Sequence, residues 1–181
     1  IRATLFETLH LSTSTGLSVN SADGRPLDFG SPTLRSLAAY LILHRARPLD
    51  RRKLAFSFWP NASESAARRN LRQYLHHLRQ ALQPLAFDGE LLTTDGSTLQ
   101  INPGAEFWVD VEAFQQGVRP GAALEEVENA LQLYSGDLLA DLYDEWCLPE
   151  REKLRELYLQ TLDHYTRSLQ TVAQFEQALV W

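Results

Sequence analysis

One amphipathic helix, predicted over residues 63–82, constrains the fold of this chain more than any other stretch. At about 3.6 residues per turn, one face of this helix gathers a leucine stripe formed by Leu71, Leu75, Leu78 and Leu82. We expect Asn61 to cap the helix, with Glu64 at capping-box spacing, and Pro84 to stop it. Because an apolar stripe must be buried, the rest of the chain has to supply the surface that covers it.

The opposite face of this helix holds cations and amides and no acid. Its members are Arg69, Arg72, Gln73, His76, Arg79 and Gln80. Solvated helix faces usually mix signs, because acid–base pairs at i,i+4 stabilise a helix. Arg and Gln can also read base edges through two hydrogen bonds. The face therefore favours an anionic partner, although a basic helix face taken alone is more often an ordinary solvated surface.

Charge divides the chain into two parts. Residues 1–104 carry 12 Lys and Arg against 8 Asp and Glu, and residues 105–181 carry 5 against 15, giving formal charges of +4 and −10. Residues 51–82 hold seven cations against the single acid Glu64. A local basic patch in an otherwise acidic protein usually meets nucleic acid. The split predicts two domains with different partners, residues 1–104 and residues 105–181.

Composition and motifs exclude several classes of function. No apolar run approaches the ~18 residues that span a bilayer, and we expect a cytoplasmic protein. The single cysteine, Cys147, is expected to be a buried apolar side chain and rules out an internal disulfide. His76 and His77 point about 100° apart on a helix and so do not share an ion. With no nucleophile set, metal cluster or Gly-rich phosphate loop, we expect no enzyme activity, no metal and no cofactor.

The order of elements in the N-terminal part indicates its fold. Strands are predicted at residues 4–11, 16–19 and 25–29, the last an edge strand after an Asp23-Gly24 turn. A helix capped by Ser31 follows, and then a short helix capped by Asp50. Their buried positions are expected to be Leu34, Leu37, Ala38 and Leu41 in the first, and Leu54, Phe58 and Trp59 in the second. After the basic helix, alternation around Asp95-Gly96 predicts a hairpin. This is the order of a winged helix-turn-helix, whose third helix enters the major groove.

The C-terminal part is predicted to be entirely helical. Helices are expected at residues 110–117, 122–134, 148–169 and 174–181, with an inward face on the third formed by Leu154, Leu157, Leu162, Tyr165 and Leu169. This pattern favours a tetratricopeptide-like stack that continues beyond Trp181 in the natural protein. The predicted fold is therefore an α+β winged helix-turn-helix followed by an all-α tetratricopeptide-like domain.

Several stretches, taken in order, resemble the SARP/AfsR-like bacterial transcriptional activators. The N-terminal ones are P-L-D-F-G-S-P-T-L-R-S-L-A-A-Y-L, L-D-R-R-K-L-A-F-S-F-W-P, S-A-A-R-R-N-L-R-Q-Y-L-H-H-L-R-Q-A-L, L-L-T-T-D-G-S-T-L-Q-I-N-P and F-W-V-D-V-E-A-F. The C-terminal ones, A-L-Q-L-Y-S-G-D-L-L and Y-D-E-W-C-L-P-E-R-E-K-L-R-E-L-Y-L, resemble the family's bacterial transcriptional activator domain. The resemblance implies an OmpR-type winged helix that activates transcription, binds direct repeats of double-stranded DNA in head-to-tail pairs and contacts RNA polymerase holoenzyme.

The residues expected to contact DNA are Arg51, Arg52, Arg68, Arg69, Arg72, Gln73, His76, Arg79, Thr94 and Thr98. Arg51 and Arg52 open a helix whose free N–H groups favour phosphate, and the family pattern places a basic residue that touches the DNA backbone at Arg79. The hairpin tip departs from many winged helices because it carries Asp95 and no cation, so only a weak wing contact is expected. The alternative is a protein-interaction module whose winged helix no longer binds DNA.

Overall fold

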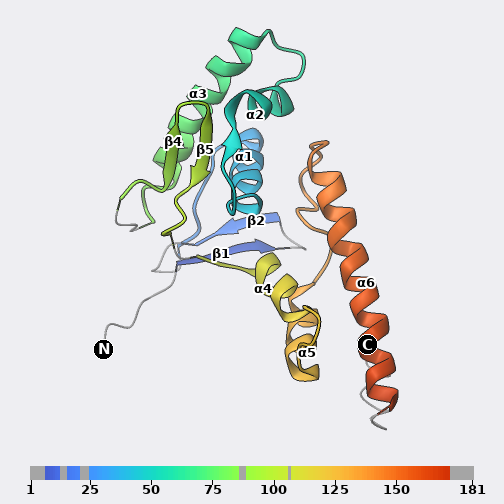
Figure 1. Cartoon of the computed structure of the whole chain (residues 1–181). Helices are drawn as coiled ribbons and strands as arrows, with labels where there is room; N and C mark the ends of the chain where they lie inside the picture. Colours follow the sequence, from blue (N-terminus) through green and yellow to red (C-terminus); the bar gives the residue numbers. More distant parts are fainter. Residues whose placement is uncertain (1–6, 13–15, 21–24, 86–88, 106, 172–181) are drawn as a thin grey trace, which may run out of the picture. The chain divides into compact units, whose positions relative to one another are not determined.

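The computed structural model describes residues 7–12, 16–20, 25–85, 89–105 and 107–171, and Figure 1 follows them along the chain. The elements are β1 (Glu7–Ser12), β2 (Gly16–Val19), α1 (Pro32–Leu43), β3 (Leu49–Asp50), α2 (Arg51–Phe58), α3 (Glu64–Ala81), β4 (Leu92–Asp95), β5 (Thr98–Ile101), β6 (Phe107–Val109), α4 (Asp110–Gly117), α5 (Leu124–Leu133) and α6 (Cys147–Thr171). They form two compact units, Ile1–Leu9 with Leu17–Phe107 and His10–Gly16 with Trp108–Trp181. Two three-stranded sheets have the strand orders β2-β1-β6 and β3-β5-β4.

The core of the first unit forms where α1, α2 and α3 pack together. Ser31 caps α1 by accepting a hydrogen bond from the Leu34 N–H at 3.2 Å, and Pro32 occupies the first turn, as predicted. The predicted apolar positions of α1 are all buried, together with Ser36, Ala39 and Ile42. In α2 the buried residues are Leu54 and Ala55, whereas Phe58 and Trp59 are half-buried and contact Tyr40 and Tyr74 as aromatic pairs.

Helix α3 confirms the predicted amphipathic helix almost to the residue. Its buried residues are Ala67, Leu71, Leu75 and Leu78, and Leu82 lies half-buried just after the last turn. The predicted cap was wrong. Ser63, not Asn61, accepts the hydrogen bond from the Ala66 N–H at 3.3 Å, because the loop from α2 places its hydroxyl over the first turn.

The β4–β5 hairpin is confirmed, but its turn is shifted by one residue. Asp95 pairs with Thr98, so Gly96 and Ser97 form the two-residue loop in place of the predicted Asp95-Gly96. Gly96 has a φ of +51°, a conformation that glycine adopts without steric strain. The short strand β3 was not predicted, and Leu49 pairs with Leu99 to add it to this sheet.

The predicted strand at residues 25–29 was wrong. This segment makes one isolated bridge, between Asn20 and Pro26, and the Leu27 N–H donates to the Val19 carbonyl at 2.8 Å. Proline has no N–H with which to continue a ladder. The predicted Asp23-Gly24 turn and the predicted helix at 174–181 lie outside the described residues.

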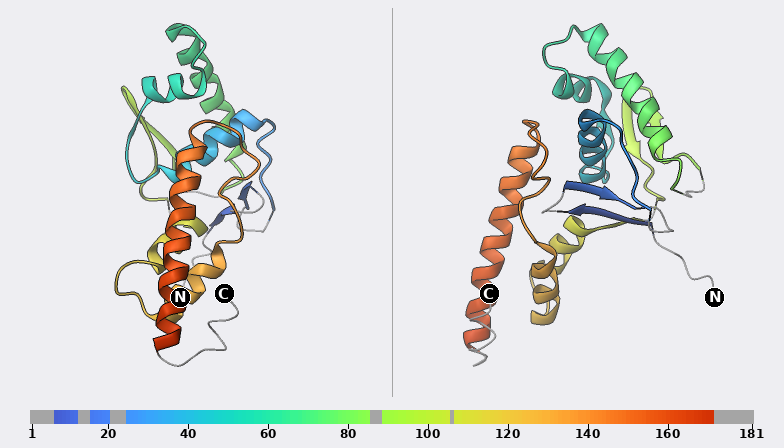
Figure 2. Two further views of the ribbon diagram at one scale, coloured as in Figure 1. Left: turned by 90° about the vertical axis from the view of Figure 1, so that its right-hand side faces the viewer. Right: turned by 180° about the vertical axis from the view of Figure 1, so that it is seen from behind.

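In the second unit, α5 packs against both α4 and α6. Phe114, Leu131 and Tyr165 are among its most deeply buried side chains, and the rings of Tyr134 and Tyr158 stack with centroids 4.2 Å apart. Figure 2 shows α6 as one continuous helix. On its predicted inward face Leu154, Tyr165 and Leu169 are buried, and Leu157 and Leu162 are half-buried. No described helix combines the length and apolarity that crossing a membrane requires.

Candidate nucleic-acid interface

The exposed face of α3 is the first component of the candidate site. Burial of the leucine stripe leaves the opposite side of the helix in solvent, and this side holds the exposed residues Arg69, Arg72, Gln73 and His76. No hydrogen bond or ion pair of the described residues occupies the side chain of Arg69, Arg72 or Gln73. These three side chains are therefore available to a partner.

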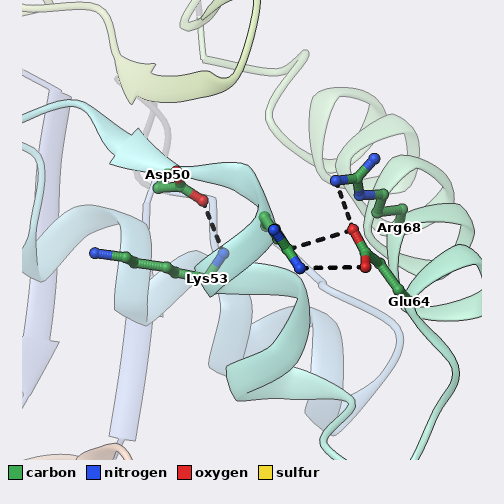
Figure 3. Close-up of polar contacts among 5 residues, drawn as sticks. Asp50, Lys53, Glu64 and Arg68 are labelled. Carbon is green, nitrogen blue, oxygen red and sulfur yellow. Dashed lines mark hydrogen bonds and ion pairs between the residues drawn. The ribbon is translucent and has the colours of Figure 1, made fainter.

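The second component is the start of α2. Asp50 caps this helix by accepting a hydrogen bond from the Lys53 N–H at 2.9 Å, and that bond lowers the pKa of the Asp50 carboxyl below its ordinary value (Figure 3). The Arg51 N–H donates to the Ser97 carbonyl at 2.8 Å, which fixes the hairpin turn beside the helix. Local capping and a long-range backbone bond thus set the position of the two arginines, Arg51 and Arg52.

A hollow of about 430 Å³ joins these components. Its lining comes from α2, α3 and the hairpin turn, and consists of Asp50, Arg51, Arg52, Arg68, Leu71, Arg72, Gly96 and Ser97. Four arginines thus line the hollow together with Asp50, whose carboxylate caps its own helix. Such a concentration of positive charge at a helix start fits a phosphate group.

Glu64 ties two of these arginines together across the helix–helix junction. Both oxygens of its carboxylate contact the Arg52 guanidinium at 3.3 Å, and one of them also contacts the Arg68 guanidinium at 2.7 Å (Figure 3). All three side chains are between 43% and 61% exposed, so each pair contributes only about 0–1 kcal/mol to stability. Glu64 and Arg68 lie four residues apart, the spacing of an ion pair on one helix, whereas nothing in the sequence pointed to the pair with Arg52.

Three other predicted contacts lie along the hairpin. Arg79 donates to the Leu92 carbonyl of β4 at 3.4 Å, so one of its donors already serves the fold. The Thr98 hydroxyl donates to the Asp95 carbonyl at 3.1 Å, and Thr94 is exposed. The structure therefore brings Arg51, Arg52, Arg68 and Arg72 around one hollow and leaves Arg79 at the other end of α3. Sequence reasoning missed Ser97, whose only signal was its place after the hairpin glycine.

The described residues offer little for metal or covalent chemistry. No group of three or more His, Cys, Asp or Glu side chains in this part of the chain could hold a metal ion. The rings of His76 and His77 are tilted by 54° with centroids 5.9 Å apart. Cys147 is fully buried, and burial raises the pKa of its thiol.

Cys147 is therefore expected to resist alkylation in the folded protein. Its side chain is 0% exposed and its raised pKa keeps the thiolate scarce, so iodoacetamide should react at neutral pH only through opening of the second unit. Because the folded state favours the protonated thiol, this contribution to stability is present below the ordinary thiol pKa and is lost as pH rises through the raised one. Mass spectrometry in native buffer and in urea measures both rates, and rapid native labelling would contradict the prediction.

Comparisons with known proteins show what the chain is similar to. Residues 109–180 match the bacterial transcriptional activator domain. The transcriptional regulatory protein MoaR1 of Mycobacterium tuberculosis and that of Mycobacterium bovis are each 26% identical over 130 residues, which is 66% of this chain and 42% of the relative. The chain thus spans less than half the length of these relatives.

A solved structure shares the fold. Mycobacterium tuberculosis EmbR, in complex with a low affinity phosphopeptide, matches 97% of this chain and 48% of its own with a TM-score of 0.74 and 23% identity. The likeness therefore covers nearly all of the helices and small sheets of this chain. The chain is therefore similar to SARP-like bacterial transcriptional regulators, and its residues 109–180 match the bacterial transcriptional activator domain.

Proposed function

We propose that this chain binds double-stranded DNA sequence-specifically and activates transcription. Residues 1–104 act as a winged helix-turn-helix that inserts α3 into the major groove, and residues 105–181 act as a tetratricopeptide-like activator domain. The order α1, α2, α3 and hairpin, with α2 and α3 packed together, supports the winged helix. The transcriptional regulatory function named for MoaR1 supports the biological role.

One observation carries the proposal: Arg72 belongs both to the acid-free face of α3 and to the lining of the arginine hollow. A helix placed in the major groove needs side chains for bases on one face and cations for phosphates beside them. Here Arg69, Gln73 and His76 supply the first, and Arg51, Arg52 and Arg68 supply the second. Arg72 lies where the two meet and contacts either a base edge or a phosphate.

The hairpin has a smaller role in this proposal. Arg79 keeps its bond to β4 and offers its remaining donors to the DNA backbone. Thr94 approaches the backbone through its hydroxyl group, whereas the Thr98 hydroxyl must first give up its bond to the Asp95 carbonyl, and Asp95 repels phosphate. The wing therefore adds little to affinity.

Residues 105–181 are proposed to contact the protein partners. Residues 105–181 carry 15 acids against 5 cations, so this part repels the DNA backbone and suits basic or polar protein surfaces. By resemblance, these partners are a second copy of the protein on a direct repeat and RNA polymerase holoenzyme. A regulator that binds bacterial DNA would work in the cytoplasm, and the proposed role calls for no cofactor and no enzyme activity.

The test is selection of bound duplexes from a random library at moderate salt, with wild type beside Arg72→Ala. We expect an enriched motif, arranged as a direct repeat, whose affinity falls about 5- to 150-fold in Arg72→Ala, because a good base or phosphate contact contributes ~1–3 kcal/mol. The log–log salt dependence of binding should have a slope of roughly −0.9 per phosphate contact.

Arg155→Ala is the matched control for this experiment. Arg155 is an exposed arginine of α6, so its removal changes the net charge equally while leaving the α3 face intact. It should bind the selected duplex as wild type does. If wild type enriches no sequence and has no duplex affinity at low salt, the protein-interaction module is the correct function.

A further inference from the structure

Glu64 is the acid at the start of α3, and its carboxylate holds two guanidinium groups. Its two oxygens meet Arg52 through a fork of two contacts at 3.3 Å, and one of them meets Arg68 at 2.7 Å (Figure 3). A phosphodiester also presents two charged oxygens, and arginine binds both groups in the same forked geometry. Glu64 therefore occupies donors that a DNA phosphate would use.

We propose that Glu64 acts as an internal competitor of the DNA backbone and sets an upper limit on the affinity of the chain for DNA. This inference rests on the proposed function. Arg52 and Arg68 line the hollow of about 430 Å³ together with Arg51 and Arg72, which Glu64 does not contact. A phosphate that enters the hollow meets two arginines that Glu64 does not hold and two that it must share with Glu64.

The expected size of the effect follows from electrostatics at an exposed site. Two like charges roughly 6 Å apart in water change a binding constant by about threefold, and the effect shrinks at high salt. The release of two guanidinium groups adds to this factor. Replacement of Glu64 by glutamine, which keeps the shape and removes the charge, should therefore tighten binding by about three- to tenfold at low salt.

A purely structural role for Glu64 predicts the opposite result. Glu64 lies in the first turn of α3, where its charge favours the helix, and it links α3 to α2 through Arg52. If that link were needed to hold the two helices for DNA, Glu64→Gln would weaken binding. The sign of the change thus separates competition from positioning.

The experiment measures binding of wild type, Glu64→Gln and Glu126→Gln to the selected duplex and to a random-sequence duplex over a range of salt. Glu126→Gln is the matched control, because Glu126 forms a similar exposed pair with Arg119 at 3.4 Å in the second unit and its loss changes the net charge equally. Glu64→Gln should bind both duplexes about three- to tenfold more tightly, with a log–log salt slope steeper by roughly 0.9. Glu126→Gln should match wild type, and thermal unfolding checks that both variants fold.

A double-mutant cycle completes the test. Arg68→Ala should cost more affinity in the Glu64→Gln background than in wild type, because Glu64 no longer occupies the guanidinium. If wild type binds DNA and Glu64→Gln binds it equally or more weakly, the proposal that Glu64 competes with phosphate is wrong. Loss of preference for the selected duplex overturns it as well, because Glu64 would then read a base. If wild type itself binds no duplex, the proposed function fails first and the two failures are distinguished.

Discussion

Replacing Arg151 with leucine is expected to destabilise the second unit by about 3 kcal/mol. The Arg151 guanidinium is half-buried and donates to the carbonyls of Leu138 at 2.8 Å, Leu139 at 2.7 Å and Leu142 at 3.0 Å. Each hydrogen bond from a charged donor contributes roughly 1.5–3 kcal/mol, and contributions that share one donor do not add fully. Removal of the guanidinium leaves three carbonyls of the α5–α6 loop without this donor.

The backbone of this loop explains why the effect should be large. Leu139 is fully buried with a φ of +50°, a left-handed conformation that costs a non-glycine residue roughly 1–2 kcal/mol. Arg151 bonds to the carbonyls on both sides of this strained position and holds it in place. The loop therefore depends on a side chain that reaches it from α6.

Urea unfolding followed by circular dichroism, together with hydrogen exchange of α6, measures this loss. Arg151→Lys should retain only part of the stability, because an ammonium lacks the planar fork of donors. Arg155→Leu, at an exposed position one turn later, should stay within about 0.5 kcal/mol of wild type. A wild-type stability in Arg151→Leu would show that the loop is held by its buried leucines alone.

Replacing Gly117 with alanine is expected to destabilise the second unit by about 1–3 kcal/mol. A Cβ at this position, the last residue of α4, would lie 2.6 Å from the Ala130 Cβ and 3.2 Å from the Glu126 carbonyl oxygen of α5. In an open helix the same change is favourable, because alanine loses less backbone freedom on folding. Here the close approach of α4 and α5 makes the same change destabilising.

A compensating variant tests that explanation directly. Ala130→Gly removes the atom that clashes, so the double variant with Gly117→Ala should recover part of the lost free energy of unfolding. The recovery should be incomplete, because the Glu126 carbonyl stays in place. Gln116→Ala, an exposed neighbour, serves as the control. Strictly additive effects would show that the strain arises elsewhere.

Patterns that act over one or two turns predicted much of this fold. Apolar spacing located α1 and α3, and Ser31 and Asp50 were recognised as caps because a cap bonds to its own helix three residues on. The hairpin was predicted from the alternation of residues around Asp95-Gly96. The cap of α3 was wrong because Ser63 and Asn61 are both suitable cap residues. The strand at residues 25–29 was wrong because this segment forms one isolated bridge, at Pro26, and no ladder.

The candidate interface was predicted as a set of residue types rather than as an arrangement. The sequence determined an acid-free helix face, because residues on one side of a helix follow from its period. Only the tertiary structure decided that Arg52 and Arg68 meet on Glu64 and that Arg51 bonds to Ser97. It also decided that Arg151 holds Leu139. The physical reason is that a helix period is set by bonds within four residues, whereas these contacts join segments brought together by burial of the core, and no local pattern records which partner burial will supply.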